Sequence, residues 1–221
     1  MEKYKLTDKS IEYFGHTLYR IEALKDFGGV SKGDKGGYIE KEDNLSQDDD
    51  AWVYDNARVY DNARVYDNAR VFDNAWVFGD ARVFDDAWVY DNARVYDNAW
   101  VYGDARVYDD AWVFGDARVF DDAWVFGDAR VFDDAWVYGD ARVSGNARVS
   151  GDFKIGTGYL FATKYNGSDV TEVKVDNVTY YIQDYKPVIE EEIKERVEES
   201  DDKTQEAMRL LKEQGYKIIR Q

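Results

Sequence analysis

The sequence predicts an all-β solenoid followed by a small α+β module, and three observations lead to this fold class. A six-residue unit recurs seventeen times without a gap from Ala51 to Asp152. Within each unit, Ala and Val at positions one and three alternate with larger side chains at positions two and four, which is the period of a β-strand. Positions five and six are always Asp, Asn or Gly, which favour turns. Short strands joined by corners of fixed length wind the chain into coils.

The segment before the repeat, residues 1–36, is expected to form an N-terminal cap. Residues 17–24 alternate as an amphipathic strand, and an uncovered solenoid end would offer a strand edge to another chain. His16 lies at the start of this strand and is interpreted as an ordinary surface or packing residue. The glycine-rich segment 33–37 lacks the strand and helix that flank a phosphate-binding loop. We expect it to be a turn into the first coil.

The solenoid itself is assigned to residues 37–158. Ile39 and Leu45 are six residues apart and are interpreted as degenerate units that precede the regular ones. At the other end, Phe153 and Ile155 take the places of Ala and Val. The small inward residues predict an interior that is too narrow for a ligand cavity.

The remaining residues, 159–221, are expected to form the α+β module. Strands joined by Asn-Gly and Asp-Asn turns are predicted within 158–185. A helix is predicted over 188–200, a second over 202–214 with a capping-box signal at its start, and a last strand over 216–220. A module this small must pack on something to gain a core. Both a C-terminal cap and a partner-binding head are open interpretations.

The pattern Val-x-x-(Asn/Asp)-Ala-x resembles the hexapeptide repeat of left-handed parallel β-helix proteins, a group related to bacterial transferase-hexapeptide proteins. The lead-in GDKGGYIEKEDNLSQ at 33–47 resembles that of uncharacterised phage and prophage members. The resemblance implies a triangular left-handed parallel β-helix in which three units make a coil of 18 residues. It also implies trimers with parallel axes as a common assembly.

An 18-residue coil would stack the outward side chains in columns. Trp and Arg then alternate at position two, and a guanidinium on an indole is favourable by roughly 0.5–1 kcal/mol. The aromatic residues at position four are expected to expose more apolar surface than a monomer carries, which predicts self-association as a dimer or trimer. The candidate interaction surface consists of these ladders and one acidic corner: Trp76, Trp88, Trp100, Trp112, Trp124, Arg94, Arg106, Arg118, Asp86, Asp104, Asp122 and Asp140.

Acidic residues dominate the charge. The chain has 46 Asp and Glu against 29 Lys and Arg, for a net charge of −17. This balance argues against direct binding to nucleic acid or to an anionic membrane surface. For the acidic corners, three alternatives stay open: a solvated edge that keeps the rod soluble, calcium bridging, and mimicry of nucleic-acid phosphates. The solvated edge is favoured because surface charge usually has that role, and the nine-residue calcium repeat is absent.

The chain lacks the residues for several kinds of chemistry. It has no Cys and one His, which excludes disulfides, thiol nucleophiles and sites that need several imidazoles. The resemblance implies a histidine base in acyltransferases and three zinc-binding histidines in carbonic anhydrases, and no histidine follows residue 16. We therefore assign no catalytic, cofactor-binding or metal-binding residue and expect no enzyme activity. No apolar run or leader-like start indicates a membrane segment or export signal, so a cytoplasmic location in a bacterial host is expected.

Together these observations favour a non-enzymatic, phage- or prophage-encoded solenoid that binds or blocks a protein partner. A host defence protein that binds nucleic acid is one such partner. Two alternatives stay open: a divergent hexapeptide acyltransferase, and a structural component of a virion or cell surface.

Overall fold

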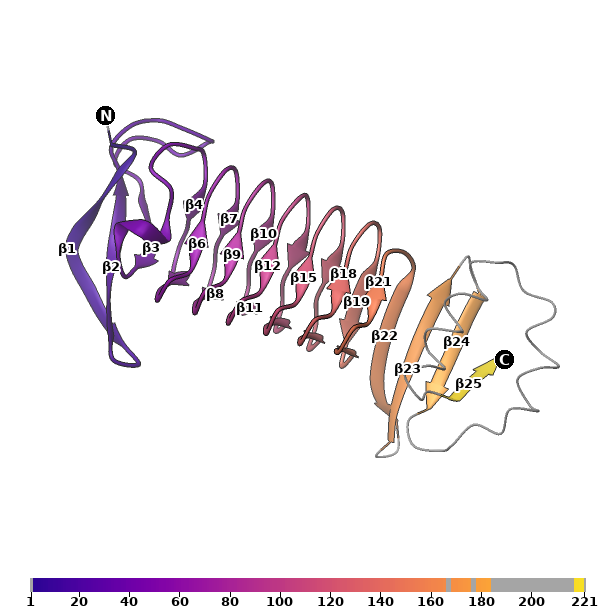
Figure 1. The fold of residues 1–221 in the computed structure, drawn as a ribbon. Coiled ribbons are helices and arrows are strands. Elements are labelled where there is room, and N and C mark those ends of the chain that lie inside the picture. The colour runs from indigo at the N-terminus through magenta and orange to yellow at the C-terminus, as the bar shows by residue number, and fades with distance from the viewer. Residues whose placement is uncertain (1, 166–167, 176–177, 184–216, 221) are drawn as a thin grey trace.

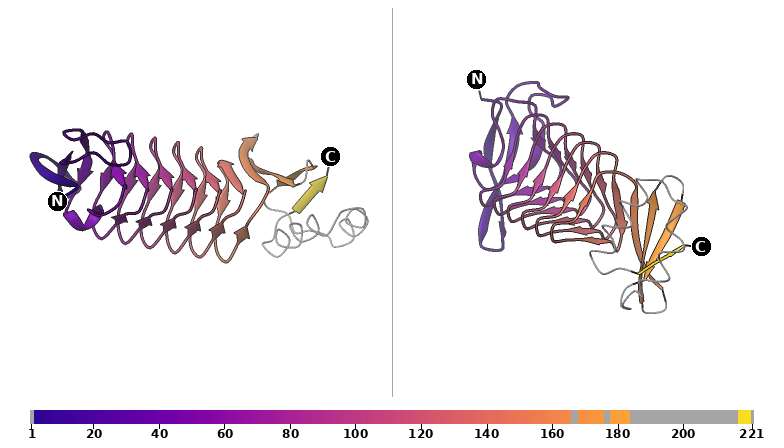
Figure 2. Two further views of the ribbon diagram at one scale, coloured as in Figure 1. Left: turned by 90° about the horizontal axis from the view of Figure 1, so that it is seen from above. Right: turned by 45° about the vertical axis from the view of Figure 1, so that its right-hand side comes forward.

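A computed structural model describes residues 2–165, 168–175, 178–183 and 217–220, with side chains as far as Phe161. The helices expected at 188–200 and 202–214 lie outside these residues. The coils stack along one axis into a rod, with the N-terminal cap at one end and strands β22–β24 at the other (Figures 1 and 2).

Three sheets form the faces of the rod. The first has nine strands in the order β1 (Tyr4–Tyr13), β2 (His16–Ala23), β3 (Lys35–Ile39), β5 (Arg58–Val59), β8 (Trp76–Val77), β11 (Arg94–Val95), β14 (Trp112–Val113), β17 (Arg130–Val131) and β20 (Arg148–Val149). The second has ten, in the order β25 (Lys217–Arg220), β24 (Val178–Gln183), β23 (Ser168–Val175), β22 (Tyr159–Tyr165), β19 (Arg142–Gly145), β16 (Trp124–Val125), β13 (Arg106–Val107), β10 (Trp88–Val89), β7 (Arg70–Val71) and β4 (Trp52–Val53). The third has six, in the order β21 (Lys154–Ile155), β18 (Trp136–Val137), β15 (Arg118–Val119), β12 (Trp100–Val101), β9 (Arg82–Val83) and β6 (Arg64–Val65).

The strand register confirms the coil length. Trp88 pairs in parallel with Arg70 on one side and Arg106 on the other, so each partner is 18 residues away. The same offset relates the strands of the other two sheets, for example Arg94 to Trp112 and Trp100 to Arg118. The chain is therefore a parallel β-solenoid with three faces. The first sheet takes one strand from each of seven coils, β3 to β20.

The core consists of the Ala and Val columns. Every Ala at position one and every Val at position three is buried, with exposed fractions of 2% or less. Fully burying a Val side chain is worth about 1.5–3 kcal/mol, so the repeat places an apolar anchor in each strand. This arrangement matches the narrow interior expected from the sequence.

The corners depend on position five of each unit. All ten Asp and all seven Gly at this position have left-handed backbone, with φ between 48° and 69°. Asp enters this region more readily than most residues because its short side chain can form local hydrogen bonds. Five of these Asp carboxylates accept a hydrogen bond from a glycine amide in the next coil: Asp61 from Gly79, Asp85 from Gly103, Asp109 from Gly127, Asp121 from Gly139 and Asp133 from Gly151.

Replacing a corner glycine by alanine separates backbone strain from steric crowding. A Cβ at Gly79 would lie 2.8 Å from the amide nitrogen of Asp97, whereas a Cβ at Gly151 would meet no atom within 4 Å. Both residues have left-handed φ, so both variants bear the strain of about 1 kcal/mol. We expect Gly79→Ala to lower the free energy of unfolding by about 2 kcal/mol and Gly151→Ala by about half as much. Urea denaturation of the two variants measures the difference, and equal losses would contradict the steric term.

The N-terminal cap is an antiparallel hairpin that extends the first sheet. Strand β1 pairs with β2, and β2 pairs with β3. The expectation of a turn at 33–37 is wrong for Gly36 and Gly37, which lie within β3. Glycine is needed there because a Cβ would lie 2.6 Å from a backbone oxygen, that of Val53 for Gly36 and that of Ala57 for Gly37. The two residues let the hairpin approach the first coil.

Lys3 closes the end of the rod. Its side chain is fully buried, and its Nζ donates hydrogen bonds to the backbone oxygens of Asp49 and Ala51 at 3.0 and 2.9 Å. The carboxylate of Asp49 lies 3.3 Å from the same nitrogen. The cap also covers Trp52, which packs against Tyr4 and Phe27 and is 1% exposed. Trp52 therefore does not begin an outward column, as the repeat alone suggested.

The degenerate first units join the regular coils with one adjustment. Ile39 pairs with Val59, and Leu45 pairs with Val65. Both offsets are 20 residues, and a short 3-10 helix, η1 (Glu42–Asn44), lies between the two sites. The buried Asn44 amide donates hydrogen bonds to the backbone oxygens of Asp61 and Ala63 at 3.1 and 2.9 Å. These bonds satisfy carbonyl groups on the edge of the next coil.

At the other end, β19 is longer than the preceding strands and pairs in parallel with β22. Strands β22 to β25 then pair antiparallel in sequence order. This confirms the strands expected within 158–185 and at 216–220. Among the described residues, no helix has the length and apolar character needed to cross a bilayer.

Candidate functional site

The flat faces carry ladders in which Arg and Trp alternate. The Arg94 guanidinium lies 4.4 and 4.8 Å from the ring centroids of Trp76 and Trp112. Arg106 lies between Trp88 and Trp124, at 5.3 and 5.1 Å, and Arg118 lies 5.0 Å from both Trp100 and Trp136. These distances are within the range of cation–π attraction. The structure thus confirms that these arginines contact aromatic rings within their own columns.

The aromatic residues at position four stack face to face between coils. Phe72 and Tyr90, and then Tyr90 and Tyr108, have ring centroids 4.8 Å apart and nearly parallel planes. Stacking covers both ring faces, and burial raises the pKa of Tyr108 to about 12. In the part of the chain with described side chains, Phe14 is the one exposed large hydrophobic residue, at 80%. The rings are therefore less open to solvent than their outward direction suggested, and self-association stays a prediction.

The acidic corner runs between the third and second sheets. Asp86, Asp104, Asp122 and Asp140 each occupy position six of a unit, 18 residues apart, and all four are exposed. Adjacent coils are separated by about 4.8 Å, the spacing of neighbouring strands. These four form the longest uninterrupted run of position-six carboxylates on any corner. We call them the acidic column.

The arginines of the faces do not neutralise the acidic column. Among the described side chains, every salt bridge lies in the cap or the first two coils: Lys3 with Asp49, Lys5 and Lys35 with Glu22, and His16 with Glu40 and Asp61. The arginines contact rings instead. At about 4.8 Å, two adjacent carboxylates in water repel each other by about 1 kcal/mol. The column is therefore a line of uncompensated negative charge.

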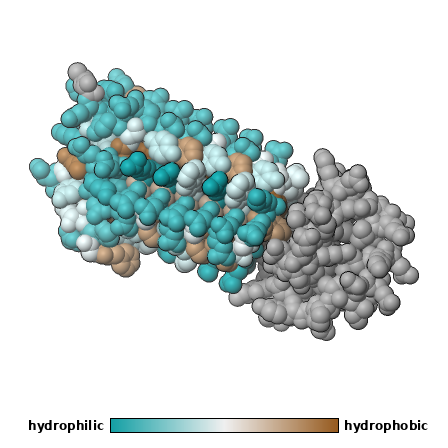
Figure 3. All heavy atoms as spheres, viewed as in Figure 1, coloured by the Kyte–Doolittle hydropathy of each residue, from teal (hydrophilic) through white to brown (hydrophobic). Residues whose placement is uncertain are grey.

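A second corner shows how a carboxylate line and a ladder lie together. An open groove of about 900 Å³ is lined by Asp116, Asp134 and Asp152 on the corner and by Arg118, Trp136 and Lys154 on the third sheet. Figure 3 shows the rod from one side, where hydrophilic residues dominate the surface and hydrophobic ones are interspersed. The twelve residues of the predicted interaction surface thus do not form one site. The eight ladder residues are divided among three faces, and the four Asp lie on one edge.

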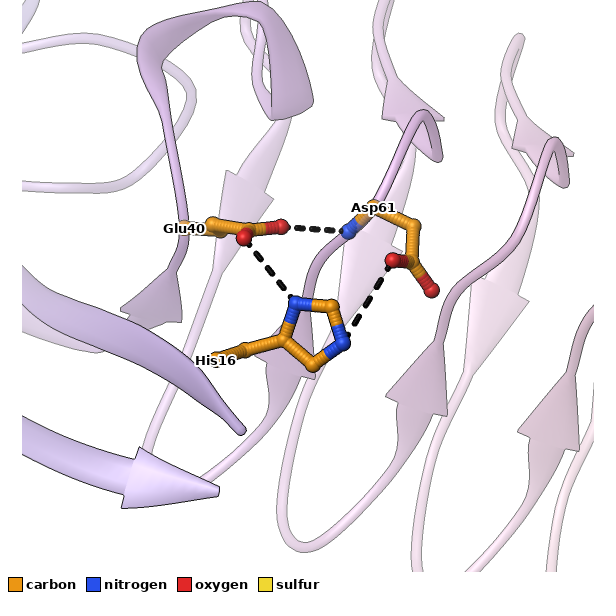
Figure 4. Close-up of side chains that lie close together, drawn as sticks. All are labelled: His16, Glu40 and Asp61. Atoms are coloured by element: carbon orange, nitrogen blue, oxygen red, sulfur yellow. Dashed lines mark hydrogen bonds and ion pairs between the residues drawn. The ribbon is translucent and has the colours of Figure 1, made fainter. Parts of the chain in front are cut away.

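The sequence did not predict the cluster around the only histidine. His16 at the start of β2, Glu40 after β3 and Asp61 at a corner of the next coil converge (Figure 4). The His16 Nδ1 lies 3.0 Å from Glu40 Oε1, and its Nε2 lies 3.5 Å from Asp61 Oδ1. The two carboxylates face different ring nitrogens, so they do not converge on one nitrogen as ligands of a single ion would. We assign the group as an ion-pair triad.

Comparison with known proteins supports the repeat and does not extend to the termini. Five segments match the family model described as YdcK Beta solenoid repeat: residues 51–65, 63–78, 87–103, 99–115 and 141–156. They all lie in the coils and cover about a third of the chain. No curated protein matches the sequence. The matches and the observed coils show that the chain is a repeat β-solenoid protein.

Proposed function

We propose that this protein is a non-catalytic binding protein whose acidic column engages a positively charged surface on a protein partner. The observation that carries the proposal is the division of charge. The described face arginines contact tryptophans, and the exposed Asp86, Asp104, Asp122 and Asp140 have no cation beside them. A cationic partner would relieve the repulsion along the column.

A non-catalytic role fits the placement of the ionisable groups. The single histidine is held in the triad at the cap, and the coils contain no other histidine. The carboxylates of the coils lie on regular convex corners. The resemblance to phage and prophage proteins favours a bacterial cell as the setting. There, the nucleic-acid-binding groove of a host defence protein would offer the cationic surface.

Neutralising the acidic column tests the proposal. The quadruple variant Asp86→Asn, Asp104→Asn, Asp122→Asn, Asp140→Asn keeps side-chain shape and removes four charges. The matched control changes Asp80, Asp116, Asp134 and Asp152 to Asn on another corner, which alters the net charge equally. Exposed charge pairs contribute about 0.2–1 kcal/mol each. We therefore expect the column variant to bind its partner about tenfold more weakly.

The measurement is retention of proteins from a nuclease-treated bacterial lysate by the immobilised chain, eluted with salt and quantified by mass spectrometry. We expect the native chain to retain basic proteins, the column variant to lose them, and the control to keep most of them. Equal losses by the two variants would show only a general charge effect. That result, or retention that does not depend on salt, would contradict the proposal.

A further inference from the structure

The tip of the cap hairpin lies over the first coils and carries unusual backbone. Phe14 and Gly15 both have positive φ, 46° and 89°, as the two central residues of a type I′ turn require. Phe is a poor residue for this conformation, and here it is also 80% exposed. The turn therefore holds strain, and other contacts must keep the tip in place.

Two sets of contacts hold the tip. Tyr13 packs edge-on against Trp76 and Tyr60, at centroid distances of 5.1 and 6.0 Å, and its ring lies 4.8 Å from the Arg58 guanidinium. Beside this aromatic contact lies the triad, in which His16 bridges Glu40 and Asp61. The tip thereby covers Tyr60, which is 5% exposed.

The geometry of the triad defines the protonation state that holds it. Each ring nitrogen faces a carboxylate oxygen, which only accepts hydrogen bonds. Only the doubly protonated imidazolium has a donor on both nitrogens; either neutral tautomer would place a lone pair against a carboxylate. The second oxygen of Glu40 is already used, since it accepts a hydrogen bond from the Asp61 amide at 2.7 Å.

We propose that the His16 imidazolium, held between Glu40 and Asp61, is a proton-dependent latch that fixes the tip of the β1–β2 hairpin on the first two coils. On loss of the proton, the tip loosens and uncovers the aromatic surface around Tyr60 and Trp76. The latch is independent of the acidic column.

The surrounding groups are consistent with this direction. The hydrogen bond with Glu40 raises the pKa of His16, and the charge of Asp61 adds to the effect. Burial would raise the pKa of Glu40, but the hydrogen bonds from His16 and the Asp61 amide outweigh burial and lower it. Burial also raises the pKa of Tyr60 to about 12, so this neighbour is neutral.

Other charged groups lie farther from the ring. On the cap strands, Glu12 accepts a hydrogen bond from Thr17. After β3, Lys41 donates to Asn62. On β5, Arg58 lies over Tyr13. Since the pKa of His16 is raised in the folded protein, the latch is fully closed below about pH 6.5, the ordinary histidine value. It opens as the pH rises through the higher folded value.

Because the chain has one histidine, its imidazole can be observed without assignment. In protein labelled with ¹⁵N-histidine, we expect both ring nitrogens to be protonated at pH 6 and the titration midpoint to lie above 6.5. Glu40→Gln and Asp61→Asn should each lower the midpoint. A midpoint at or below 6.5, or one that neither variant shifts, would overturn the latch.

Hydrogen exchange measures the motion of the tip. After correction for intrinsic rates, exchange over residues 11–17 should rise about three- to tenfold from pH 6 to 8.5, as expected for two partly exposed ion pairs. Residues 94–113 serve as a reference that should not change. In His16→Gln, which has no titrating ring, the rise should vanish even if the tip is looser throughout. The same rise in that variant, or tip exchange that responds to a chelator at fixed pH, would overturn the proposal.

Discussion

Val107→Asp is expected to be the most damaging substitution in the rod. Val107 is fully buried and pairs with Val89 and Val125 in the adjacent coils. A carboxylate there has no cation within the Ala and Val columns and must be buried unpaired or protonated. An unpaired buried charge costs about 3–5 kcal/mol. We expect a loss of that size in urea denaturation, with hydrogen exchange increasing most in the coils on either side, because each coil contacts only its neighbours.

Asn92→Asp is the matched control, since it adds the same charge at an exposed corner. We expect it to change the free energy of unfolding by less than about 0.5 kcal/mol. If Val107→Asp were tolerated as well as Asn92→Asp, the inward direction of position three would be wrong.

Lys3→Met is expected to release the N-terminal cap. The Lys3 ammonium is buried against two backbone oxygens and the Asp49 carboxylate. Burial lowers the pKa of Lys3, and Asp49 opposes that effect. Methionine fills similar space and donates no hydrogen bond, so it leaves three acceptors without their donor. We expect the cap to lose about 3 kcal/mol, measured as increased hydrogen exchange in β1 and β2 and at Trp52.

Lys9→Met removes the same charge from an exposed position of β1. Its effect on cap exchange should be within about 0.5 kcal/mol. Equal exchange in the two variants would show that Lys3 contributes only its charge and does not close the end of the rod.

The sequence predicts most of the coil region because its structure is local and periodic. Ala and Val at alternate positions determine which side chains face inward, as at Ala93 and Val95. Asp and Gly determine the corners. The 18-residue coil then places Arg94 beside Trp112. Each of these features repeats within a few residues, so one unit specifies its neighbours.

The features that the sequence did not predict depend on contacts between distant residues. The Lys3 side chain meets Asp49 and Ala51, and His16 meets Glu40 and Asp61. The burial of Trp52 results from a cap strand that has no counterpart in the repeat. The twelve candidate surface residues were placed in the correct columns, and only the three-dimensional arrangement shows that three faces and one edge divide them.

The ladders, the acidic column and the proposed partner surface all require a coil of 18 residues. Because the chain has no Cys, two engineered cysteines test this directly. Arg94→Cys with Trp112→Cys places thiols on adjacent strands, β11 and β14, about 4.8 Å apart, within reach of a disulfide. Arg94→Cys with Arg106→Cys places them on different sheets. Under mild oxidation, we expect an intramolecular disulfide in the first pair and none in the second. A disulfide in the second pair and none in the first would contradict the account.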